Sequence, residues 1–395
     1  MATKKLIGMT GDQAAAHAMR QIAPDVVAAY PITPQTEIVM SFSQFVADGK
    51  VATELIPVES EHSAMSACIG SAAAGARTMT ATSANGLALM WEVVYIAAST
   101  RLPIVMSVVN RALSAPINIH CDHSDTMGAR DSGWIQIYSE NAQEVYENII
   151  SAVKIAEHKD IRLPVMVCQD GFITSHAVEG IELSDDKTIK DFIGEYKIDH
   201  SLLDIDNPVT YGPLDLQDFY FEHKYQQSFA MKNALSVIPK VLQEFNKTFG
   251  KNHDLIEEYK LKDADIGIVA LSSTAGTARA VIDDLRKKGI KAGLLKPVFF
   301  RPFPAERILK AISHLKVVGV MDRAESFSTM GGPLFSEIRS AMYDSKQKPP
   351  IVNYIYGLGG RDIFPEDIEK VYEELESIKR AGKIKTLISY LGVRE

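Results

Sequence analysis

Short apolar runs alternate with helix-forming segments in the N-terminal part of the chain, and this alternation limits the folds that the chain can adopt. The runs occupy residues 26–30, 55–58, 78–82, 102–109 and 163–168. Continuous apolar strands separated by helices are typical of a parallel sheet that helices cover on both faces. We therefore predict an α/β fold on a parallel sheet, and we expect these runs to be buried strands.

The chain is long enough for more than one unit, because 395 residues suit about two or three domains with a sizeable core. We predict a first unit over residues 1–240, a helical connector over 241–262 and a smaller α/β unit over 263–395. Residues 176–215 are polar with few apolar repeats, which indicates a wrapping arm. Residues 226–260 carry a charged helical pattern that overlaps the connector.

Composition narrows the class of partner and the cell compartment. The formal net charge of -8 argues against nucleic acid or an anionic membrane, which require a basic face. No apolar run reaches the length of a membrane span and the N-terminus lacks a signal-peptide apolar region, so we expect a cytoplasmic protein. Cys68, Cys121 and Cys168 are far apart and form no C-x-x-C motif. An iron–sulfur cluster or a structural zinc ion would therefore need thiolates from another chain.

Polar residues follow several of the predicted strands at the point where each strand ends. Thr33, Glu61, the turn 83–86 and Arg111 each come shortly after an apolar run. The carboxyl ends of parallel strands meet at one edge of a sheet, and ligands bind at that edge. The sequence therefore predicts a single site that these residues share.

Glu61 begins a helical segment made almost entirely of small residues, from Ala64 to Gly75. Small side chains allow a large flat group to approach the backbone closely. An acid at a helix N-terminus is most often explained by the helix dipole alone, and Glu59 competes for a functional role. We favour Glu61 because it stands immediately before the small-residue segment.

Thr33 and Arg111 each have a structural and a functional interpretation. Thr33 either caps the following helix or donates its hydroxyl to a substrate oxygen. Arg111 is either a surface ion-pair partner or a carboxylate clamp, because its planar guanidinium can bind two oxygens at once. Arg111 ends a buried strand and opens a long loop, which favours the clamp.

The segment 112–133 is irregular and polar, and about twenty such residues inside a domain usually form a functional loop. It contains His120, Asp122, His123 and Asp125, whose spacing resembles that of metal ligands. No predicted helix holds them in register, so we predict no metal site here. We predict instead a mobile loop that closes over a substrate.

Two further turns in the sequence are candidates for ligand binding. Residues 272–276 resemble an anion-binding turn before a helix. Nucleotide binding there is weakly supported, because the turn lacks the G-x-x-x-x-G-K-[ST] and G-x-G-x-x-G motifs. Residues 357–362 are rich in glycine but open no clear strand–helix unit, so we interpret them as a plain turn.

Several motifs, in order along nearly the whole chain, together resemble the alpha subunits of pyruvate:ferredoxin oxidoreductases, within the multi-subunit 2-oxoacid:ferredoxin oxidoreductase family. Each motif alone is modest, but the set is highly specific. The motifs are Tyr30–Pro34, Glu59–Ala64, Thr80–Gly86, Asn110–Pro116, Asp122–Asp125, Arg130–Trp134, Phe300–Pro304, and Asp322 and Arg323 with Gly331–Pro333.

The resemblance implies a fold and a cofactor site. It implies a pyrimidine-binding type of thiamine diphosphate domain over 1–240 and a transketolase C-terminal-like domain, mainly for assembly, over 263–395. Glu61 would contact N1′ of the aminopyrimidine, and Thr33 and Arg111 would hold the keto and carboxylate oxygens of the substrate. The other implied cofactor-binding residues are Tyr30, Pro31, Ser83, Asn85 and Gly86, and the implied substrate-loop residues are Ser114, Asp122 and His123.

The resemblance also implies a reaction that needs partner chains. Pyruvate would be decarboxylated oxidatively with coenzyme A to acetyl-CoA and CO2, and electrons would reach ferredoxin through [4Fe-4S] clusters in partner subunits. The chain lacks the Gly-Asp-Gly motif of the diphosphate-and-magnesium half of such sites, and Gln169–Gly171 is its nearest approach. A beta subunit would therefore supply Mg2+ and share the thiamine diphosphate, with gamma and delta subunits completing the complex.

Three alternatives stay open at this point. The motif Arg111–Pro116 resembles pyruvate and branched-chain members rather than 2-oxoglutarate members, so 2-oxoisovalerate or an aryl 2-oxoacid could replace pyruvate. A transketolase- or dehydrogenase-type thiamine diphosphate component would work without ferredoxin. A non-catalytic scaffold would keep the fold alone, and the presence of Thr33, Glu61 and Arg111 argues against it.

Overall fold

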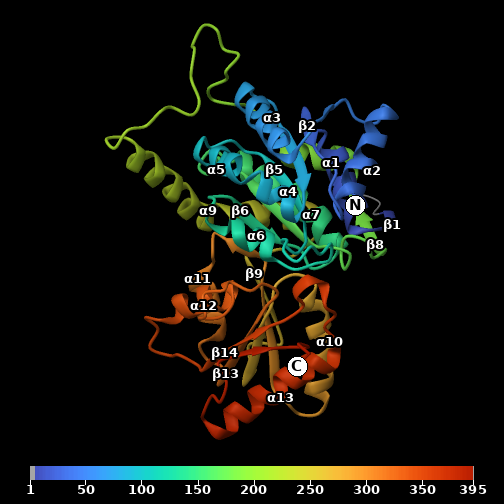
Figure 1. The fold of residues 1–395 in the computed structure, drawn as a ribbon. Coiled ribbons are helices and arrows are strands. Elements are labelled where there is room, and N and C mark those ends of the chain that lie inside the picture. Colours follow the sequence, from blue (N-terminus) through green and yellow to red (C-terminus); the bar gives the residue numbers. More distant parts are fainter. Residues whose placement is uncertain (1–4, 395) are drawn as a thin grey trace.

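Two largely parallel sheets organise residues 5–394, which the computed structural model describes (Figure 1). The first sheet has seven strands in the order β12–β6–β7–β5–β4–β2–β3. All neighbouring pairs in it are parallel except β12 and β6. Its strands are β2 (Val26–Ala29), β3 (Glu54–Pro57), β4 (Thr78–Thr82), β5 (Val105–Asn110), β6 (Ile135–Tyr138), β7 (Val165–Asp170) and β12 (Phe299–Arg301).

Helices cover this sheet, and local signals in the sequence explain where they begin. Thr10 and Gln13 form a capping box at the start of the first helix, and Ser60 caps the helix that begins at Glu61. Every residue of β4, β5 and β7 is buried, which confirms the prediction of a parallel sheet covered on both faces. The helices are α1 (Gly11–Ile22), α2 (Thr36–Ala47), α3 (Glu61–Ala74), α4 (Ala84–Leu89), α5 (Trp91–Ser99) and α7 (Ala142–Glu157).

Strand β3 is an edge strand, so the prediction of a buried strand at 55–58 is wrong. It pairs only with β2, and Glu54 and Pro57 are exposed while Leu55 and Ile56 are half-buried. An apolar run is sufficient to predict a strand. It does not reveal whether the sheet continues beyond that strand, because pairing depends on distant parts of the chain.

The second sheet has six strands in the order β15–β14–β13–β10–β11–β9, with only β9 antiparallel to its neighbour. Its strands are β9 (Ile256–Tyr259), β10 (Ile266–Val269), β11 (Ala292–Pro297), β13 (Val317–Asp322), β14 (Ile351–Ile355) and β15 (Ile388–Tyr390). The helices packed around it are α10 (Thr274–Lys287), α11 (Ala305–Ile312), α12 (Pro333–Met342) and α13 (Pro365–Ala381). This sheet and its helices form the C-terminal lobe of Figure 1. Strand β12 leaves this part of the sequence to join the first sheet.

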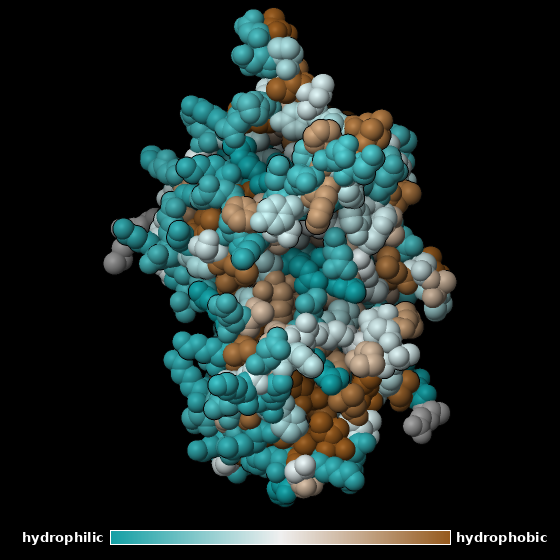
Figure 2. Space-filling view, turned by 90° about the vertical axis from the view of Figure 1, so that its left-hand side faces the viewer, coloured by the Kyte–Doolittle hydropathy of each residue, from teal (hydrophilic) through white to brown (hydrophobic). Residues whose placement is uncertain are grey.

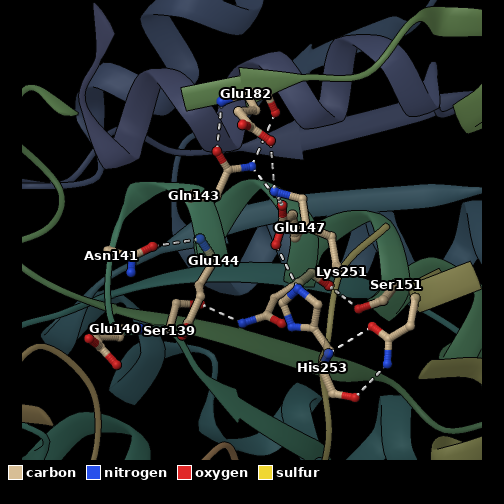
Figure 3. Close-up of polar contacts among 12 residues, drawn as sticks. Ser139, Glu140, Asn141, Gln143, Glu144, Glu147, Ser151, Glu182, Lys251 and His253 are labelled. Carbon is tan, nitrogen blue, oxygen red and sulfur yellow. Dashed lines mark hydrogen bonds and ion pairs between the residues drawn. The ribbon is translucent and has the colours of Figure 1, made fainter. Parts of the chain in front are cut away.

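The predicted connector is helical only in its first part. Helix α9 (Tyr220–Phe249) begins before residue 226, Gly250 is its C-cap, and β9 follows it. Polar contacts hold the segment after α9 against α7: the Glu147 carboxylate lies 2.6 Å from Nε2 of His253 and 2.8 Å from Nζ of Lys251 (Figure 3). These contacts direct the chain from α9 into the second sheet.

The predicted wrapping arm over 176–215 is wrong in its first half. Strand β8 (Glu179–Leu183) pairs with β1 (Lys5–Met9), and α8 (Asp186–Ile193) buries Ile189 and Phe192 in the core. The extended arm comprises residues 195–219. Its first part is bonded to the lobe, where the N–H of Leu202 donates to the carbonyl of Ala73 at 3.0 Å, and a loop farther along projects away from the lobe (Figure 1). Figure 2 shows hydrophobic side chains on the arm. Among residues 5–394, no helix is long and apolar enough to cross a membrane.

Candidate functional site

Glu61 occupies the first position of α3, at the corner that follows β3. Its side chain is buried, with an exposed fraction of 6 % for the residue. Within residues 5–394, no other residue donates a hydrogen bond to its carboxylate. A buried carboxylate without a donor is costly for folding unless a proton or a ligand satisfies it. No hydrogen bond within the described fold therefore explains the position of this carboxylate.

Glu59, the competing acid, has a different environment. It is exposed, and it accepts a hydrogen bond from the hydroxyl of Ser63. This bond lowers the pKa of Glu59. Glu59 is thus an exposed acid near a helix N-terminus with a local hydrogen bond, which supports the choice of Glu61 as the functional residue.

Gly86, in the first turn of α4, brings the backbone after β4 against Glu61. A Cβ atom at Gly86 would lie 2.7 Å from Oε1 of Glu61 and 2.5 Å from Oγ1 of Thr82, so only glycine fits. The hydroxyls of Thr82 and Ser83 are buried beside it and have no hydrogen-bond partner in the described part of the chain. A carboxylate, a close backbone and two unpaired hydroxyls are a suitable donor and acceptor set for a flat polar ring such as an aminopyrimidine.

Arg111 and Thr33 lie together at the same edge of the sheet. Arg111 is buried, with 7 % of its surface exposed, and its Nη1 donates to the backbone oxygen of Thr33 at 2.9 Å. Its Nε donates to the backbone oxygen of Asn118 at 2.9 Å. Within residues 5–394, Nη2 of Arg111 donates to no other residue, which leaves this donor for an anion.

The turn after β4 also contacts the loop after β5. Oδ1 of Asn85 accepts from the backbone N–H of Ser114 at 3.4 Å and from its hydroxyl at 3.3 Å. Tyr30 and Pro31, at the end of β2, are exposed on the same edge. The structure thus brings the turn residues, Ser114 and the Arg111–Thr33 pair to the carboxyl edge of the first sheet.

Asp125 positions this edge, and its role was not expected from the sequence. Its Oδ2 accepts from the backbone N–H of Ala84 at 3.1 Å and of Arg111 at 3.0 Å, and its Oδ1 accepts from Nδ2 of Asn110 at 2.8 Å. Burial raises the pKa of Asp125 to about 6. The carboxylate joins the ends of β4 and β5, which carry the turn and the arginine. No sequence pattern indicates this role, because the donors are backbone groups of distant segments.

Asp122 and His123 lie in the contact between the lobes. Nε2 of His123 is 2.8 Å from Oδ1 of Asp170, and Asp122 accepts from the backbone N–H of Gly359 at 3.1 Å. The prediction that 112–133 lacks regular structure is wrong, because α6 (Ser124–Gly128) and a 3-10 turn, η1 (Ala129–Asp131), form within it. These short elements were missed because buried polar contacts, rather than an apolar pattern, stabilise them.

The turn predicted as an anion site binds a carboxylate of the chain itself. The backbone N–H of Ser273, at 3.2 Å, and its hydroxyl donate to Oδ2 of Asp170, and Nη1 of Arg323 donates to the same oxygen at 3.0 Å. Burial opposes ionisation of Asp170, yet Arg323 and His123 hold its pKa well below its usual range. Asp170 belongs to Gln169–Gly171, the segment most similar to a Gly-Asp-Gly motif. Its carboxylate therefore stabilises the contact between the lobes.

Comparison with protein families gives two matches that together span most of the chain. A model described as pyruvate flavodoxin/ferredoxin oxidoreductase, thiamine diphosphate-binding, matches residues 17–243. A model described as pyruvate:ferredoxin oxidoreductase core domain II matches residues 264–368.

Curated relatives match over nearly their whole length. The pyruvate synthase subunit PorA of Thermotoga maritima is 57% identical over 98% of this chain and 98% of its own. The subunit of the same name from Methanocaldococcus jannaschii is 48% identical over 93% of this chain and 94% of its own. The ketoisovalerate oxidoreductase subunit VorA of Pyrococcus abyssi is 42% identical over 96% of this chain and 95% of its own.

Two solved structures show the same fold. A 2-oxoglutarate:ferredoxin oxidoreductase from Magnetococcus marinus superposes with a TM-score of 0.69 at 20% identity, covering 94% of this chain and 66% of that longer chain. A split-gene transketolase, described as an inactive beta4 tetramer, superposes with a TM-score of 0.56 at 12% identity, covering 95% of this chain and 100% of that one. These matches confirm the predicted α/β fold class.

Proposed function

Because the chain belongs to the pyruvate:ferredoxin oxidoreductase family, we propose that it is the subunit of a pyruvate synthase that binds the aminopyrimidine of thiamine diphosphate. The complex oxidises pyruvate with coenzyme A to acetyl-CoA and CO2 and passes electrons to ferredoxin. The observation that carries this proposal is the buried Glu61 carboxylate against Gly86, with the unpaired hydroxyls of Thr82 and Ser83 beside it. Ordinary packing does not account for that arrangement.

When bound, thiamine diphosphate supplies the nucleophile and the electron sink for decarboxylation of a 2-oxoacid. Glu61 would hold a proton at its carboxylate for N1′ of the ring, and the small residues of α3 and Gly86 would let the ring approach. Arg111 would bind the substrate carboxylate, and its contact with the Thr33 backbone fixes the guanidinium at the sheet edge. The hydroxyl of Thr33 would donate to the keto oxygen.

A partner chain would complete the cofactor site. The chain has no Gly-Asp-Gly motif, and Asp170 is already bonded to Arg323 and Ser273. The solved transketolase of the same fold is described as split-gene and as inactive in its beta4 tetramer, so a chain of this architecture can need a second chain for activity. We assign the diphosphate, Mg2+ and the nearest [4Fe-4S] cluster to a beta subunit, and further clusters to gamma and delta subunits.

The cysteines of this chain support that division of labour. Cys68, Cys121 and Cys168 are all buried and unbonded to one another. Burial raises the pKa of each thiol, which disfavours the thiolate that a cluster requires. The electron-transfer clusters of the complex would therefore be held elsewhere.

The test is to purify the complex anaerobically and identify the chains that accompany this one. Viologen reduction is then assayed with pyruvate, 2-oxoisovalerate, 2-oxoglutarate and phenylglyoxylate, with and without coenzyme A. We expect coenzyme-A-dependent reduction with pyruvate and a partner that carries Gly-Asp-Gly. Reduction only with 2-oxoisovalerate would change the substrate to that of the VorA relative. A colourless protein without thiamine diphosphate or activity would contradict the proposal.

A further inference from the structure

We propose that Gly359 of the C-terminal lobe and Asn118 of the N-terminal lobe are positioning residues that hold Arg111 in the orientation required to bind the substrate carboxylate. This inference rests on the proposed function for the identity of the ligand. It gives the glycine-rich segment 357–362, which is interpreted from the sequence as a plain turn, a role in the site of the other lobe.

The backbone of Gly359 both donates a hydrogen bond to the Arg111 loop and accepts one from it. Its N–H donates to Oδ2 of Asp122 at 3.1 Å, and its carbonyl accepts from Nδ2 of Asn118 at 3.0 Å. Gly359 lies within the 3-10 turn η2 (Leu358–Gly360), which follows β14. A single residue of the C-terminal lobe therefore contacts two residues, Asn118 and Asp122, of the loop that begins at Arg111.

Asn118 transmits this contact to the guanidinium. Its backbone oxygen accepts from Nε of Arg111 at 2.9 Å, and its side-chain oxygen accepts from the backbone N–H of His120 at 2.6 Å. The N–H of Ala112 donates to the carbonyl of His120 at 3.0 Å, which closes the loop on itself. The guanidinium is thus held between the carbonyls of Asn118 and Thr33, and a shift of Asn118 must move or release it.

Glycine is required at this turn because the loop packs directly on its backbone. A Cβ atom at Gly359 would lie 2.6 Å from Nδ2 of Asn118, and one at Gly360 would lie 2.2 Å from Cβ of His120. Gly359 also has a φ of +60°, which disfavours any other residue. A side chain at position 359 would therefore push Asn118 away from its place.

The contact of Gly359 with Asn118 and Asp122, called the brace below, is separate from the main contact between the lobes. Asp170, with Arg323, Ser273 and His123, forms a buried ionic cluster that joins the lobes independently. The backbone N–H of His123 also donates to the carbonyl of Arg323 at 2.8 Å. A disturbance at Gly359 should therefore reach Arg111 without separating the lobes.

The test compares Gly359→Ala with Gly382→Ala in the purified complex. Gly382 has a φ of +64°, close to that of Gly359, but a Cβ atom there meets nothing within 4 Å. Both variants carry a similar backbone strain, and only Gly359→Ala adds a clash with Asn118. We expect Gly359→Ala to raise KM for pyruvate roughly tenfold with a smaller change in kcat. For Gly382→Ala we expect a KM within about twofold of the wild type.

A second readout follows Arg111 directly and does not depend on activity. Phenylglyoxal modification of Arg111, measured by peptide mass spectrometry, should be slow in the wild type and in Gly382→Ala and faster in Gly359→Ala. Asn118→Ala should show a similar rate of Arg111 modification to Gly359→Ala. The double variant should show no faster modification than Asn118→Ala alone, because both substitutions act on Arg111 through Asn118. A thermal melt of each variant checks that the lobes remain folded.

The outcomes separate the inference from the proposed function. Unchanged Arg111 modification and unchanged KM in Gly359→Ala would overturn the inference. Additive effects of Gly359→Ala and Asn118→Ala would also overturn it, since the two would then act by separate routes. If the wild-type complex oxidises no 2-oxoacid, the proposed function fails, while selective exposure of Arg111 in Gly359→Ala would still establish the brace.

Discussion

The carboxyl edge of the seven-stranded sheet and that of the six-stranded sheet place polar side chains at equivalent points, after buried parallel strands. At the first edge, buried atoms lack a hydrogen-bond partner among the described residues; they are Nε2 of Gln35, Oγ1 of Thr82, Oγ of Ser83 and Oδ1 of Asn110. At the second edge, Asp322 accepts from the backbone of Leu334 and Phe335 and from Nδ2 of Asn353. Oδ1 of Asn353 accepts from the backbone N–H of Gly332 in turn, and Nε of Arg323 is a buried atom at this edge that has no partner within residues 5–394.

This difference shows which edge is used for the fold and which is left for a ligand. The second edge packs against the first lobe, where Ser272 donates to the carbonyl of Ser139 at 2.7 Å and Arg323 reaches Asp170. Apart from Nε of Arg323, the polar groups named at this edge are satisfied by the chain itself. The first edge keeps a buried carboxylate and unpaired hydroxyls, which cost stability unless a ligand binds them. Position at a carboxyl edge therefore predicts a site only where the edge is not already covered.

The largest effect is expected at Glu61. Glu61→Gln should lower turnover of the complex about 10³-fold, because the amide cannot exchange the proton that the carboxylate shares with the cofactor ring. Steady-state viologen reduction measures this, and Glu59→Gln, at the exposed neighbour, is the matched control with near wild-type activity. Equal loss in both variants would mean that the charge of the helix N-terminus, and not Glu61 itself, is needed.

On the covered edge, the largest effect is expected for Arg323. Arg323→Ala should lower the free energy of unfolding by about 3 kcal/mol, because it leaves Asp170 buried with one partner fewer. Chemical denaturation of the chain measures the loss. If the free energy of unfolding is unchanged, water or another donor must replace the guanidinium. The contacts of the second edge would then stabilise the fold less than we infer.

Two buried acids, one at each edge, sharpen the comparison through their pH dependence. Burial raises the pKa of Asp125 and of Asp322 to about 6. The folded protein holds these protons more tightly than the unfolded chain, so each group lowers the free energy of unfolding, by about 2 kcal/mol, as the pH rises from about 4 to about 6. Replacing either acid by asparagine should remove its part of this fall, which denaturation across that range measures.

The variants Asp125→Asn and Asp322→Asn should differ in kcat/KM. Asp125→Asn should lower kcat/KM about tenfold, because the amide has one acceptor oxygen instead of two. If that oxygen accepts from the backbone of Ala84 and Arg111, the NH2 group faces the donors Nδ2 of Asn110 and N–H of Thr126. Asp322→Asn should leave kcat/KM near that of the wild type when the protein is folded. Similar activity losses in both variants would contradict the division between a ligand edge and a structural edge.

The smallest expected effect is a difference in the free energy of unfolding between the loss of an unpaired hydroxyl and the loss of a paired one. Thr82→Val should raise the free energy of unfolding slightly, by up to about 0.5 kcal/mol, since it removes a buried hydroxyl that has no partner to lose. Ser272→Ala should cost about 1 kcal/mol, since its buried hydroxyl donates to Ser139. Denaturation without added thiamine diphosphate measures both. A clear loss in Thr82→Val would mean that the hydroxyl already serves the fold.

Much of the first lobe could be predicted because its signals are local. The capping residue Thr10, the apolar runs and the small-residue segment after Glu61 each act within a few residues of themselves, and α1, β4, β5 and α3 form there. The common edge of Thr33, Glu61 and Arg111 also follows from the sequence, because parallel strands must end on the same side.

Other features depended on which segments meet, and no local pattern encodes that. The exposed β3, the strand β12 that joins the first sheet and the pairing of β8 with β1 are results of long-range packing. Asp125 accepts from backbone N–H groups, and Gly359 bonds through its own backbone to side chains of the other lobe. Backbone groups are common to nearly all residue types, so the sequence does not show which partners these two residues meet. The sequence by itself determined the elements and the residues able to do chemistry; the tertiary structure decided which edge stays open for a ligand, because only packing satisfies or leaves unpaired a buried polar atom.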